Sequence, residues 1–297
     1  MHKRKKKRIL HGRIDAFSVF IYITLGLWGL IILYPFYNAI LISMVSQYEY
    51  LNTPFMLFPK NIDLTAYNVL LQGNRLLVGY RTTLIILLLG VPLNMFLTIG
   101  MAYPLSRNRF PGQKMIFYFV VFSMLFSGGL IPLYLVVRNL GLTNNILAII
   151  LITGINTFYL ILMKNYFSSI PVSLEESAKI DGANDLYILF VIMLPLAKPI
   201  LATVLLFYTV DRWNEWFYPM IFLRNRNMIP LQMILRNIVF ETTSNEIADA
   251  AVGYRVQVFS DGIKMAAITL TMTPIMIVYP FVQKYFMKGI MLGSVKG

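Results

Sequence analysis

The chain has 297 residues, of which 58% are hydrophobic and 13% are charged, and its net charge is +13. Soluble domains carry about a quarter charged residues, so this composition predicts a membrane protein. The sequence contains no cysteine, which excludes a disulfide framework, thiol chemistry and cysteine metal sites. Its two histidines, His2 and His11, both lie in a basic N-terminal segment, so we expect neither a metal site nor histidine-based catalysis.

Residues 1–15 form this basic segment, and the simplest interpretation is a cytoplasmic tail that fixes the topology of the chain. Contact with anionic membrane lipid is compatible with that interpretation. Nucleic-acid binding is not expected, because a short tail tethered to a membrane offers no folded basic surface.

Six stretches are long and apolar enough to cross a hydrocarbon core, which requires about 20 residues per helix. They predict an all-α, polytopic protein with one transmembrane domain over residues 16–297. The expected spans are about 16–40, 82–103, 115–137, 146–163, 199–223 and 265–286.

Several of these spans contain Pro or Gly, which are tolerated where neighbouring helices or cavity water satisfy the freed backbone groups. We therefore expect a bundle with an interior. Lys and Arg are denser in alternate connections, which places both termini in the cytoplasm. The 164–195 loop is then cytoplasmic, and the long 41–81 and 224–264 loops lie outside.

The loop from Ile170 to Pro195 is the longest polar interruption on the cytoplasmic side. Pro171 ends the preceding segment, and Ser173 with Glu176 has the spacing of a capping box. Gly182 supplies a left-handed helix stop. The helix between them is about two turns long and cannot be stable alone in water, so it must dock on something.

Small residues favour close approach to this short helix. One face of the helix carries residues at the three-and-four spacing, namely Leu174, Ser177, Ala178 and Asp181. A second helix is expected to start near Asn184 or Asp185 and to run into the membrane at Pro195.

This loop resembles the EAA signature of ABC importer permeases, which reads E-A-A, three residues, G, nine residues, I-x-L-P. Glu176-Ser177-Ala178, Gly182 and Ile192-Met193-Leu194-Pro195 match every spacing, with Ser in place of the middle Ala. The resemblance extends to the Trp213-Asn214-Glu215 region and the Gly293–Gly297 ending. It is greatest to the second permease of maltose-type carbohydrate importers, in the branch for complex oligosaccharides, which the Phe126–Pro132 run supports.

The resemblance implies the type I importer permease fold and a coupling helix that sits in a cleft of an ATPase subunit. The implied coupling residues are Ser173, Leu174, Glu175, Glu176, Ser177, Ala178, Asp181, Gly182, Ala183 and Pro195. It also implies that Gly293, Val295, Lys296 and Gly297 contact the ATPases, whereas the tail from Gly289 taken by itself is a flexible end.

The implied partners are a homologous second permease, two cytoplasmic ABC ATPase subunits and an extracytoplasmic solute-binding protein. ATP and Mg²⁺ would be bound by the ATPases and no cofactor by this chain, which has no G-x-x-x-x-G-K-[ST] loop. The outer loops would receive the binding protein, or they merely connect spans.

Polar residues at membrane depth are costly and normally face an interior or a water-filled cavity. Arg212, Trp213, Asn214 and Glu215 in the fifth span are therefore candidates for a translocation path, as are Asn156 and Tyr159 in the fourth. Structural roles remain open for all six: ion pairing of Arg212, interfacial packing of the tryptophans, and interhelical hydrogen bonds.

We expect a non-catalytic permease subunit of an ATP-driven sugar importer in the bacterial plasma membrane, with oligosaccharides as solutes. An ion-coupled secondary transporter is the alternative, supported only by Asp211, Arg212 and Glu215. A membrane enzyme would need convergent carboxylates, histidines or a metal site, which the sequence does not suggest.

Overall fold

The computed structural model describes residues 16–53, 55–72, 74–107, 111–240 and 259–294, without the side chains of residues 16, 279 and 281–294. Within these ranges the chain is helical and contains no strand. The elements are α1 (Ala16–Ile42), α2 (Gln47–Asn52), α3 (Thr65–Gln72), α4 (Arg75–Ser106), α5 (Gln113–Leu125), α6 (Leu130–Asn139), α7 (Ile146–Ile152), α8 (Thr157–Ser169), α9 (Ser173–Ile180), α10 (Asp185–Tyr187), the π-helix η1 (Ile188–Met193), α11 (Leu194–Leu196), α12 (Lys198–Trp213), α13 (Phe217–Phe222), the 3-10 helix η2 (Arg226–Met228), a helix over Leu231–Phe240, and α15 (Ser260–Ser294).

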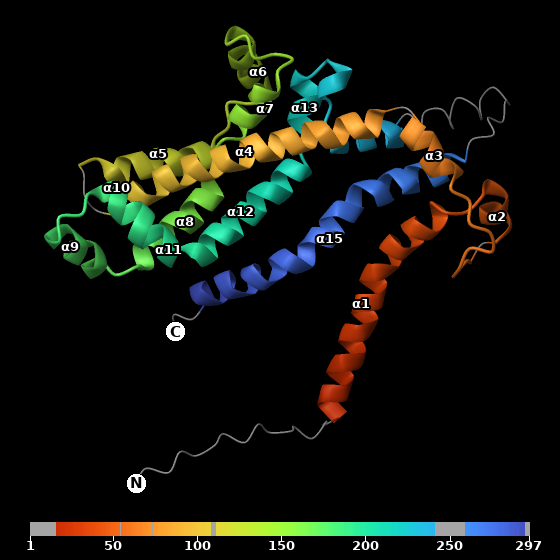
Figure 1. Ribbon diagram of the computed structural model, residues 1–297, viewed down its shortest axis with the longest axis horizontal. Coiled ribbons are helices and arrows are strands. Elements are labelled where there is room, and N and C mark those ends of the chain that lie inside the picture. Colours follow the sequence, from red (N-terminus) through yellow and green to blue (C-terminus); the bar gives the residue numbers. More distant parts are fainter. Residues whose placement is uncertain (1–15, 54, 73, 108–110, 241–258, 295–297) are drawn as a thin grey trace.

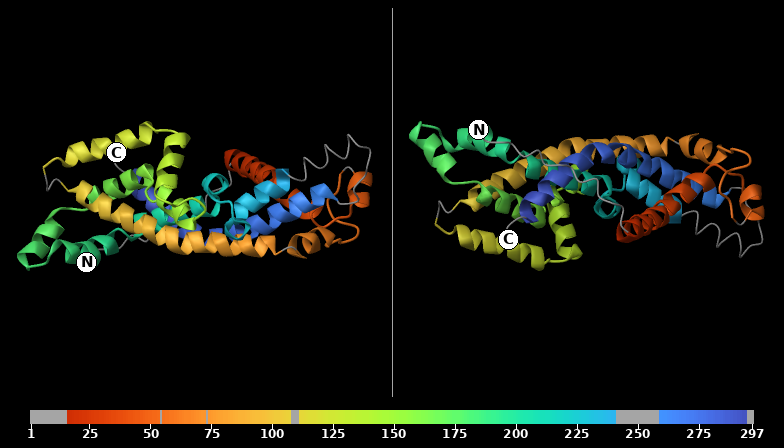
Figure 2. Two further views of the ribbon diagram at one scale, coloured as in Figure 1. Left: turned by 90° about the horizontal axis from the view of Figure 1, so that it is seen from above. Right: turned by 90° about the horizontal axis from the view of Figure 1, so that it is seen from below.

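The centre of the molecule is a set of long helices packed along α4. Figure 1 shows α4 running almost the full length of the structure, with α8 and α12 beside it and α15 against α12. At one end, α5 and the α9–α11 segment diverge on opposite sides of α4 (Figure 2). This arrangement places α9 at the tip of the molecule, away from the helix bundle.

The main core lies where α4, α8 and α12 meet η1. Leu160, Phe167, Met193 and Tyr208 are fully buried there, and the Tyr103 ring meets Phe167 edge-on at 6.0 Å between centroids. Because η1 contributes Ile188 and Met193 to this core, the segment that follows α9 is anchored in the bundle.

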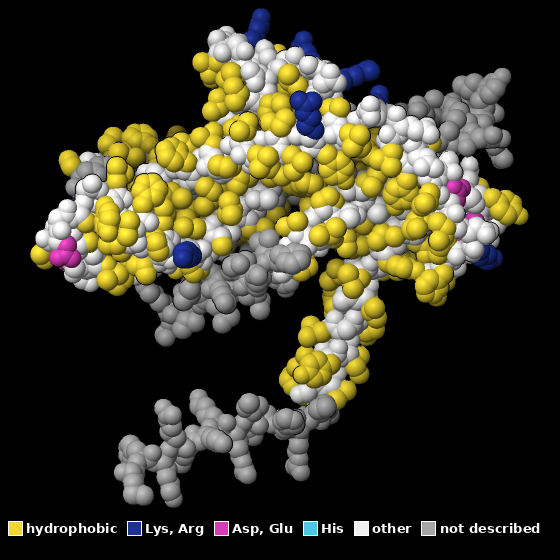
Figure 3. All heavy atoms as spheres, viewed as in Figure 1, with side chains coloured by type: hydrophobic (Ala, Val, Ile, Leu, Met, Phe, Trp, Pro, Cys, Tyr) yellow, Lys and Arg dark blue, Asp and Glu magenta, His cyan; other side chains and the backbone are white. Residues whose placement is uncertain are grey.

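Apolar side chains cover the long sides of the structure, and acidic side chains are visible near its two ends (Figure 3). Among the described residues, three helices are long and apolar enough to cross a membrane: Phe17–Ile42, Arg75–Leu105 and Ser260–Val278. Three further candidates are bent pairs of helices, with angles of 112° between α5 and α6, 49° between α7 and α8, and 83° between Asp185–Leu196 and α12.

The bends have local causes in the sequence. Gly129, between α5 and α6, has a φ of +88°, a conformation that glycine adopts without steric cost. The chain turns at Ala197 between Pro195 and Pro199, where prolines remove backbone donors and interrupt helical hydrogen bonding. The segment after Asn184 therefore starts where expected, but it does not run straight into the fifth span.

The helix α1 contacts α15, whereas its N-terminal part projects away from the bundle (Figure 1). The large side chains of the projecting part are exposed, including Trp28, Leu30 and Phe36, but Leu41 and Ile42 at the other end of α1 are buried. Such a helix is stable only where lipid or another apolar protein surface covers it.

The C-terminal helix is longer than the sequence suggested. α15 continues through Gly289 and Gly293 to Ser294, so this part of the expected flexible tail is helical. Ile290, Met291 and Leu292 continue the apolar run, and a single interior glycine costs a helix only about 1 kcal/mol. The basic segment 1–15 and the 241–258 part of the predicted 224–264 outer loop lie outside the described residues.

Two glycines of α4 provide a test of this packing. A Cβ on Gly79 would lie 2.7 Å from Ile234 Cδ1 and 3.1 Å from the Leu231 Cα, whereas a Cβ on Gly100 would have no neighbour within 4 Å. We predict that Gly79→Ala destabilises the protein by about 1–3 kcal/mol, because the backbone at Leu231 must move. Thermal unfolding of the detergent-solubilised protein should show a lower Tm for Gly79→Ala.

Gly100→Ala is the matched control, and its Tm should equal or slightly exceed that of the parent because alanine is the better helix former. Equal Tm values for the two variants would contradict the close contact between α4 and the segment at Leu231.

Candidate functional site

The short helix α9 begins one residue earlier in the chain than the sequence indicated. Val172 already has helical dihedrals (φ −65°, ψ −28°) and occupies the N-cap position, where no side chain caps the helix. Its carbonyl accepts hydrogen bonds from the N–H groups of Glu175 and Glu176. Ser173 is therefore inside the first turn, and the capping box predicted for Ser173 and Glu176 is wrong.

The end of α9 follows the prediction for Gly182. This residue has a φ of +84°, and its N–H donates to the Lys179 carbonyl at 3.0 Å. The Ala183 N–H donates to the Ala178 carbonyl at 2.9 Å, which completes a Schellman motif. Asn184 then caps the next helix by accepting a hydrogen bond from the Tyr187 N–H at 2.7 Å.

A buried ion pair attaches α9 to the end of α4. The Arg107 Nε donates to Glu175 Oε1 at 2.5 Å, and the two side chains are 4% and 0% exposed. Arg107 is the C-cap residue of α4, and its Nη2 lies 3.7 Å from the Met193 sulfur in η1. One guanidinium thus contacts both the helix before Gly182 and the π-helix after it.

The opposite side of α9 is exposed and partly apolar. Ser177 and Glu176 are exposed, Leu174 is 43% exposed and Ile180 is 86% exposed. Ala178 is the exception on the predicted docking face, because it is half-buried against the main core. The exposed surface of α9 thus carries two apolar side chains, Leu174 and Ile180, on an otherwise polar two-turn helix.

The predicted path residues on α8 and α12 make contacts within the chain. Asn156 caps α8 by accepting from the N–H groups of Phe158 and Tyr159. The Tyr159 hydroxyl donates to Asp211 Oδ2 at 2.9 Å. Arg212 is 7% exposed, and its Nη1 lies 4.0 Å from Glu215 Oε2.

The other three predicted path residues have structural contacts as well. Trp213 is buried in a second apolar cluster and its ring tilts against Tyr80. Asn214 ends α12 and accepts a hydrogen bond from Gln232 at 3.3 Å. Glu215 accepts from the Tyr218 N–H at 3.2 Å at the start of α13.

Sequence reasoning did not identify Asn94 and Tyr208, which link α4 to this region. Asn94 Nδ2 donates to the carbonyls of Thr153 and Gly154 at 2.6 and 2.7 Å, where the backbone between α7 and α8 is not helical. The Tyr208 hydroxyl lies 2.7 Å from Thr98 Oγ1 and accepts from the Asn156 N–H at 3.0 Å. The signal in the sequence was the presence of polar side chains inside apolar spans.

Some polar atoms of this region are buried without a hydrogen-bond partner among the described residues. They are Asn94 Oδ1, Arg212 Nε and Nη1, and Trp213 Nε1. A Cβ placed on Gly90 would lie 3.8 Å from Arg212 Cδ and 4.0 Å from Asn94 Oδ1, so both side chains adjoin the same part of α4. Leaving such groups unpaired costs about 1–3 kcal/mol each, which favours a binding partner such as water or a solute hydroxyl.

Of the four candidate tail residues, the structure describes only the backbone of one. Gly293 lies in the last turn of α15, whereas Val295, Lys296 and Gly297 lie outside the described residues.

Comparison with known proteins places this geometry in a family. Residues 94–291 match the model of the binding-protein-dependent transport system inner membrane component. The chain is 41% identical to the polygalacturonan/rhamnogalacturonan transport system permease protein YtcP of Bacillus subtilis, over 95% of this chain and 98% of that protein. It is 39% identical to the protein LplC of the same organism, over 100% of this chain and 98% of that one.

A solved structure has the same fold. It belongs to a bacterial ABC transporter involved in the import of the acidic polysaccharide alginate. The similar chain is 35% identical, the match covers 94% of this chain and 100% of that chain, and the TM-score is 0.82. The all-helical architecture described above is therefore that of an importer permease.

The buried ion pair between Arg107 and Glu175 leads to a testable prediction about the free energy of unfolding. We predict that Glu175→Ala lowers the free energy of unfolding by about 3–5 kcal/mol, because it leaves the Arg107 guanidinium buried and unpaired. Glu176→Ala is the matched control: Glu176 is exposed, and its loss should change stability by about 0.5 kcal/mol or less. Thermal unfolding of the purified protein measures both.

The double variant Arg107→Met with Glu175→Leu should recover part of the loss, because it removes both buried charges together. If Glu175→Ala and Glu176→Ala were equally stable, the buried pair would not hold α9 in place.

Proposed function

Because the chain belongs to the family of binding-protein-dependent transport system inner membrane components, we propose that it is the non-catalytic permease subunit of an ATP-driven importer for oligosaccharides. One relative named above is a polygalacturonan/rhamnogalacturonan transport system permease, and the similar solved structure belongs to a transporter involved in the import of alginate. Fragments of such saccharide polymers are the solutes that we propose for this chain.

The observation that carries this proposal is the construction of α9. Its inner side is fixed by the Arg107–Glu175 pair, and its outer side exposes Leu174, Ser177 and Ile180. A short helix that is held by a buried ion pair on one side and is exposed and partly apolar on the other is suited to carry displacement from a docked protein into the bundle. We propose that the docked protein is an ABC ATPase subunit.

The proposed assembly contains a homologous second permease, two cytoplasmic ATPases that bind ATP and Mg²⁺, and an extracytoplasmic solute-binding protein. Permeases of this family act in such assemblies in general, and the family description itself names the binding protein. The exposed apolar side chains of α1 have no cover within the described chain, and lipid or the second permease would cover them in the proposed assembly. Val295, Lys296 and Gly297, together with Gly293, remain proposed contacts of the ATPases.

We further propose six membrane spans with both termini in the cytoplasm. Three long helices and three bent pairs of helices have the required length and composition. In this orientation α9 faces the cytoplasm, where ATPases can reach it. ATP-driven closure of the ATPases would then move α9, and the elbow at Ala197 would transmit the movement to α12.

The proposed translocation path adjoins the region of α4, α8 and α12 that carries Asn156, Tyr159 and Arg212. Unpartnered buried atoms on Arg212 and Asn94 support this proposal, because a solute or water can satisfy them. Trp213, Asn214 and Glu215 would contribute from the end of α12. The ion-coupled transporter finds no support in the family or in the relatives.

Cross-linking tests the proposed contact, and the natural lack of cysteine makes single-cysteine variants straightforward. We predict that Ser177→Cys in α9 cross-links to an ATPase subunit in the assembled importer. Ser123→Cys on α5 is the control, because Ser123 is also exposed but lies on a predicted span. Gel electrophoresis separates the cross-linked products, and mass spectrometry of the cross-linked band identifies the partner.

The assembled importer, reconstituted in vesicles without cross-linking, should take up labelled oligosaccharide only when ATP and the binding protein are supplied. A cross-link from Ser123 but none from Ser177, or uptake that is driven by an ion gradient without ATP, would overturn the proposed function.

A further inference from the structure

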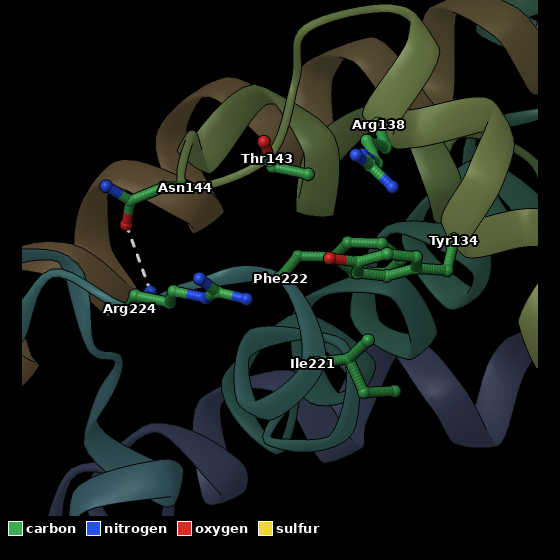
Figure 4. Close-up of a pocket in the computed structure, with 7 residues that line it drawn as sticks. All are labelled: Tyr134, Arg138, Thr143, Asn144, Ile221, Phe222 and Arg224. Carbon is green, nitrogen blue, oxygen red and sulfur yellow. Dashed lines mark hydrogen bonds between the residues drawn. The ribbon is translucent and has the colours of Figure 1, made fainter.

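A pocket of about 600 Å³ lies between α6, the connection from α6 to α7, and the segment that ends α13. Figure 4 shows the seven side chains that line it: Tyr134, Arg138, Thr143, Asn144, Ile221, Phe222 and Arg224. We call it the α6–α13 pocket. It is separate from α9 and from the cluster around Arg212.

The walls of the α6–α13 pocket are held together by Asn144, which has a φ of +57°. Its N–H donates to the Phe222 carbonyl at 2.8 Å. Its Oδ1 accepts from the N–H groups of Arg224 and Asn225 at 3.0 and 2.9 Å. Together with the stacked rings of Tyr134 and Phe222, 5.8 Å apart, these bonds fix the two sides of the pocket relative to each other.

The pocket carries two uncompensated positive charges. Within the described chain, neither the Arg138 nor the Arg224 side chain forms an ion pair or a hydrogen bond, and no acidic residue lines the pocket. By contrast, Arg107 pairs with Glu175, and Arg212 lies near Glu215. In Figure 3, Lys and Arg side chains gather around α6 and α13 without a visible acidic neighbour.

The side chains are directed toward one ligand position. In Figure 4, Arg138 lies above the Tyr134 ring, Arg224 reaches in from the opposite side, and the Tyr134 hydroxyl is directed into the space between them. Guanidinium groups bind carboxylates through two parallel hydrogen bonds, and a phenol hydroxyl adds a neutral donor. The arrangement therefore suits a ligand that has both a carboxylate and hydroxyl groups.

The position of the pocket relative to α9 is also informative. Val137 and Phe222, which adjoin the pocket, pack with Ile86 of α4, whereas α9 is attached at Arg107. These α4 positions are about 21 residues apart, or about 30 Å at 1.5 Å per residue, which is about the thickness of a hydrocarbon core. If α9 faces the cytoplasm, the pocket lies at the outer membrane surface.

We propose that the α6–α13 pocket binds the carboxylate of an acidic saccharide, a uronate unit, on the outer side of the permease. Its volume is in the range of small-molecule sites, about 300–1,000 Å³, and a single acidic protein side chain or headgroup phosphate would leave most of it unfilled. The inference rests on the proposed function and extends it, because it specifies a charged solute and a site outside the translocation path.

The experiment uses the complete importer in nanodiscs of zwitterionic lipid, with digalacturonate as the probe and galactobiose as its neutral counterpart. Isothermal titration should detect binding of digalacturonate that weakens as salt increases. The double variant Arg138→Gln with Arg224→Gln should lower this affinity about tenfold or more. Arg226→Gln is the matched control, because Arg226 is exposed on the same connection but does not line the pocket.

Several outcomes would overturn the proposal. The first is equal affinity of the pocket for digalacturonate and galactobiose. The second is an equal loss of digalacturonate affinity in Arg226→Gln. The third is a difference in affinity between the parent and the double variant that disappears when anionic lipid is added. A fourth is a double variant that leaves digalacturonate affinity unchanged but raises the binding-protein concentration for half-maximal ATPase activity, which would identify a protein-docking site.

The variants are compared only after their Tm values are shown to match the parent, and Arg138→Lys with Arg224→Lys keeps the charges if the glutamine variants unfold. The two levels of proposal remain distinguishable. Loss of ATP-driven uptake in the parent importer would contradict the proposed function, whereas uptake without digalacturonate binding at this pocket would contradict only the present inference.

Discussion

A single buried ion pair determines where α9 can be. Arg107 closes α4, and Glu175 lies in the first turn of a two-turn helix that could not persist alone in water. Their contact, with the nearby Met193 sulfur, joins α4, α9 and η1 at one point. Removing two charges from water is costly, so this pair is better explained by the fixed position that it imposes than by net stabilisation.

That fixed position links the tip of the molecule to its interior. The chain after α9 is anchored by Ile188 and Met193 in the main core, bends at Ala197, and continues as α12 toward Arg212. Under the proposed coupling, displacement of α9 would act on both α4 and α12, the two helices that carry Asn94 and Arg212. Asn94 on α4 and Arg212 on α12 lie near the same glycine, Gly90, so relative movement of these helices would alter that polar region.

Much of the fold could be predicted because apolar length and local turn chemistry are properties of short segments. The Gly182 stop is an example, since a left-handed residue at a helix end requires only its neighbours. The partner of Glu175 is 68 residues away, so no local pattern identifies Arg107. Ser173 failed as a cap because helical dihedrals already begin after Pro171. The α6–α13 pocket was not predicted either, because it forms only when α6 and α13 are brought together.

The most direct test of this account is to exchange the two charges. In the assembled importer, Arg107→Glu and Glu175→Arg should each uncouple ATP hydrolysis from solute uptake, because each places two like charges together in a buried site. The double exchange should restore coupled uptake to a large fraction of the parental rate, measured as solute transported per ATP hydrolysed in vesicles. Equal coupling in the single and double variants, or full coupling in both single variants, would contradict the claim that this pair transmits force from α9 to the bundle.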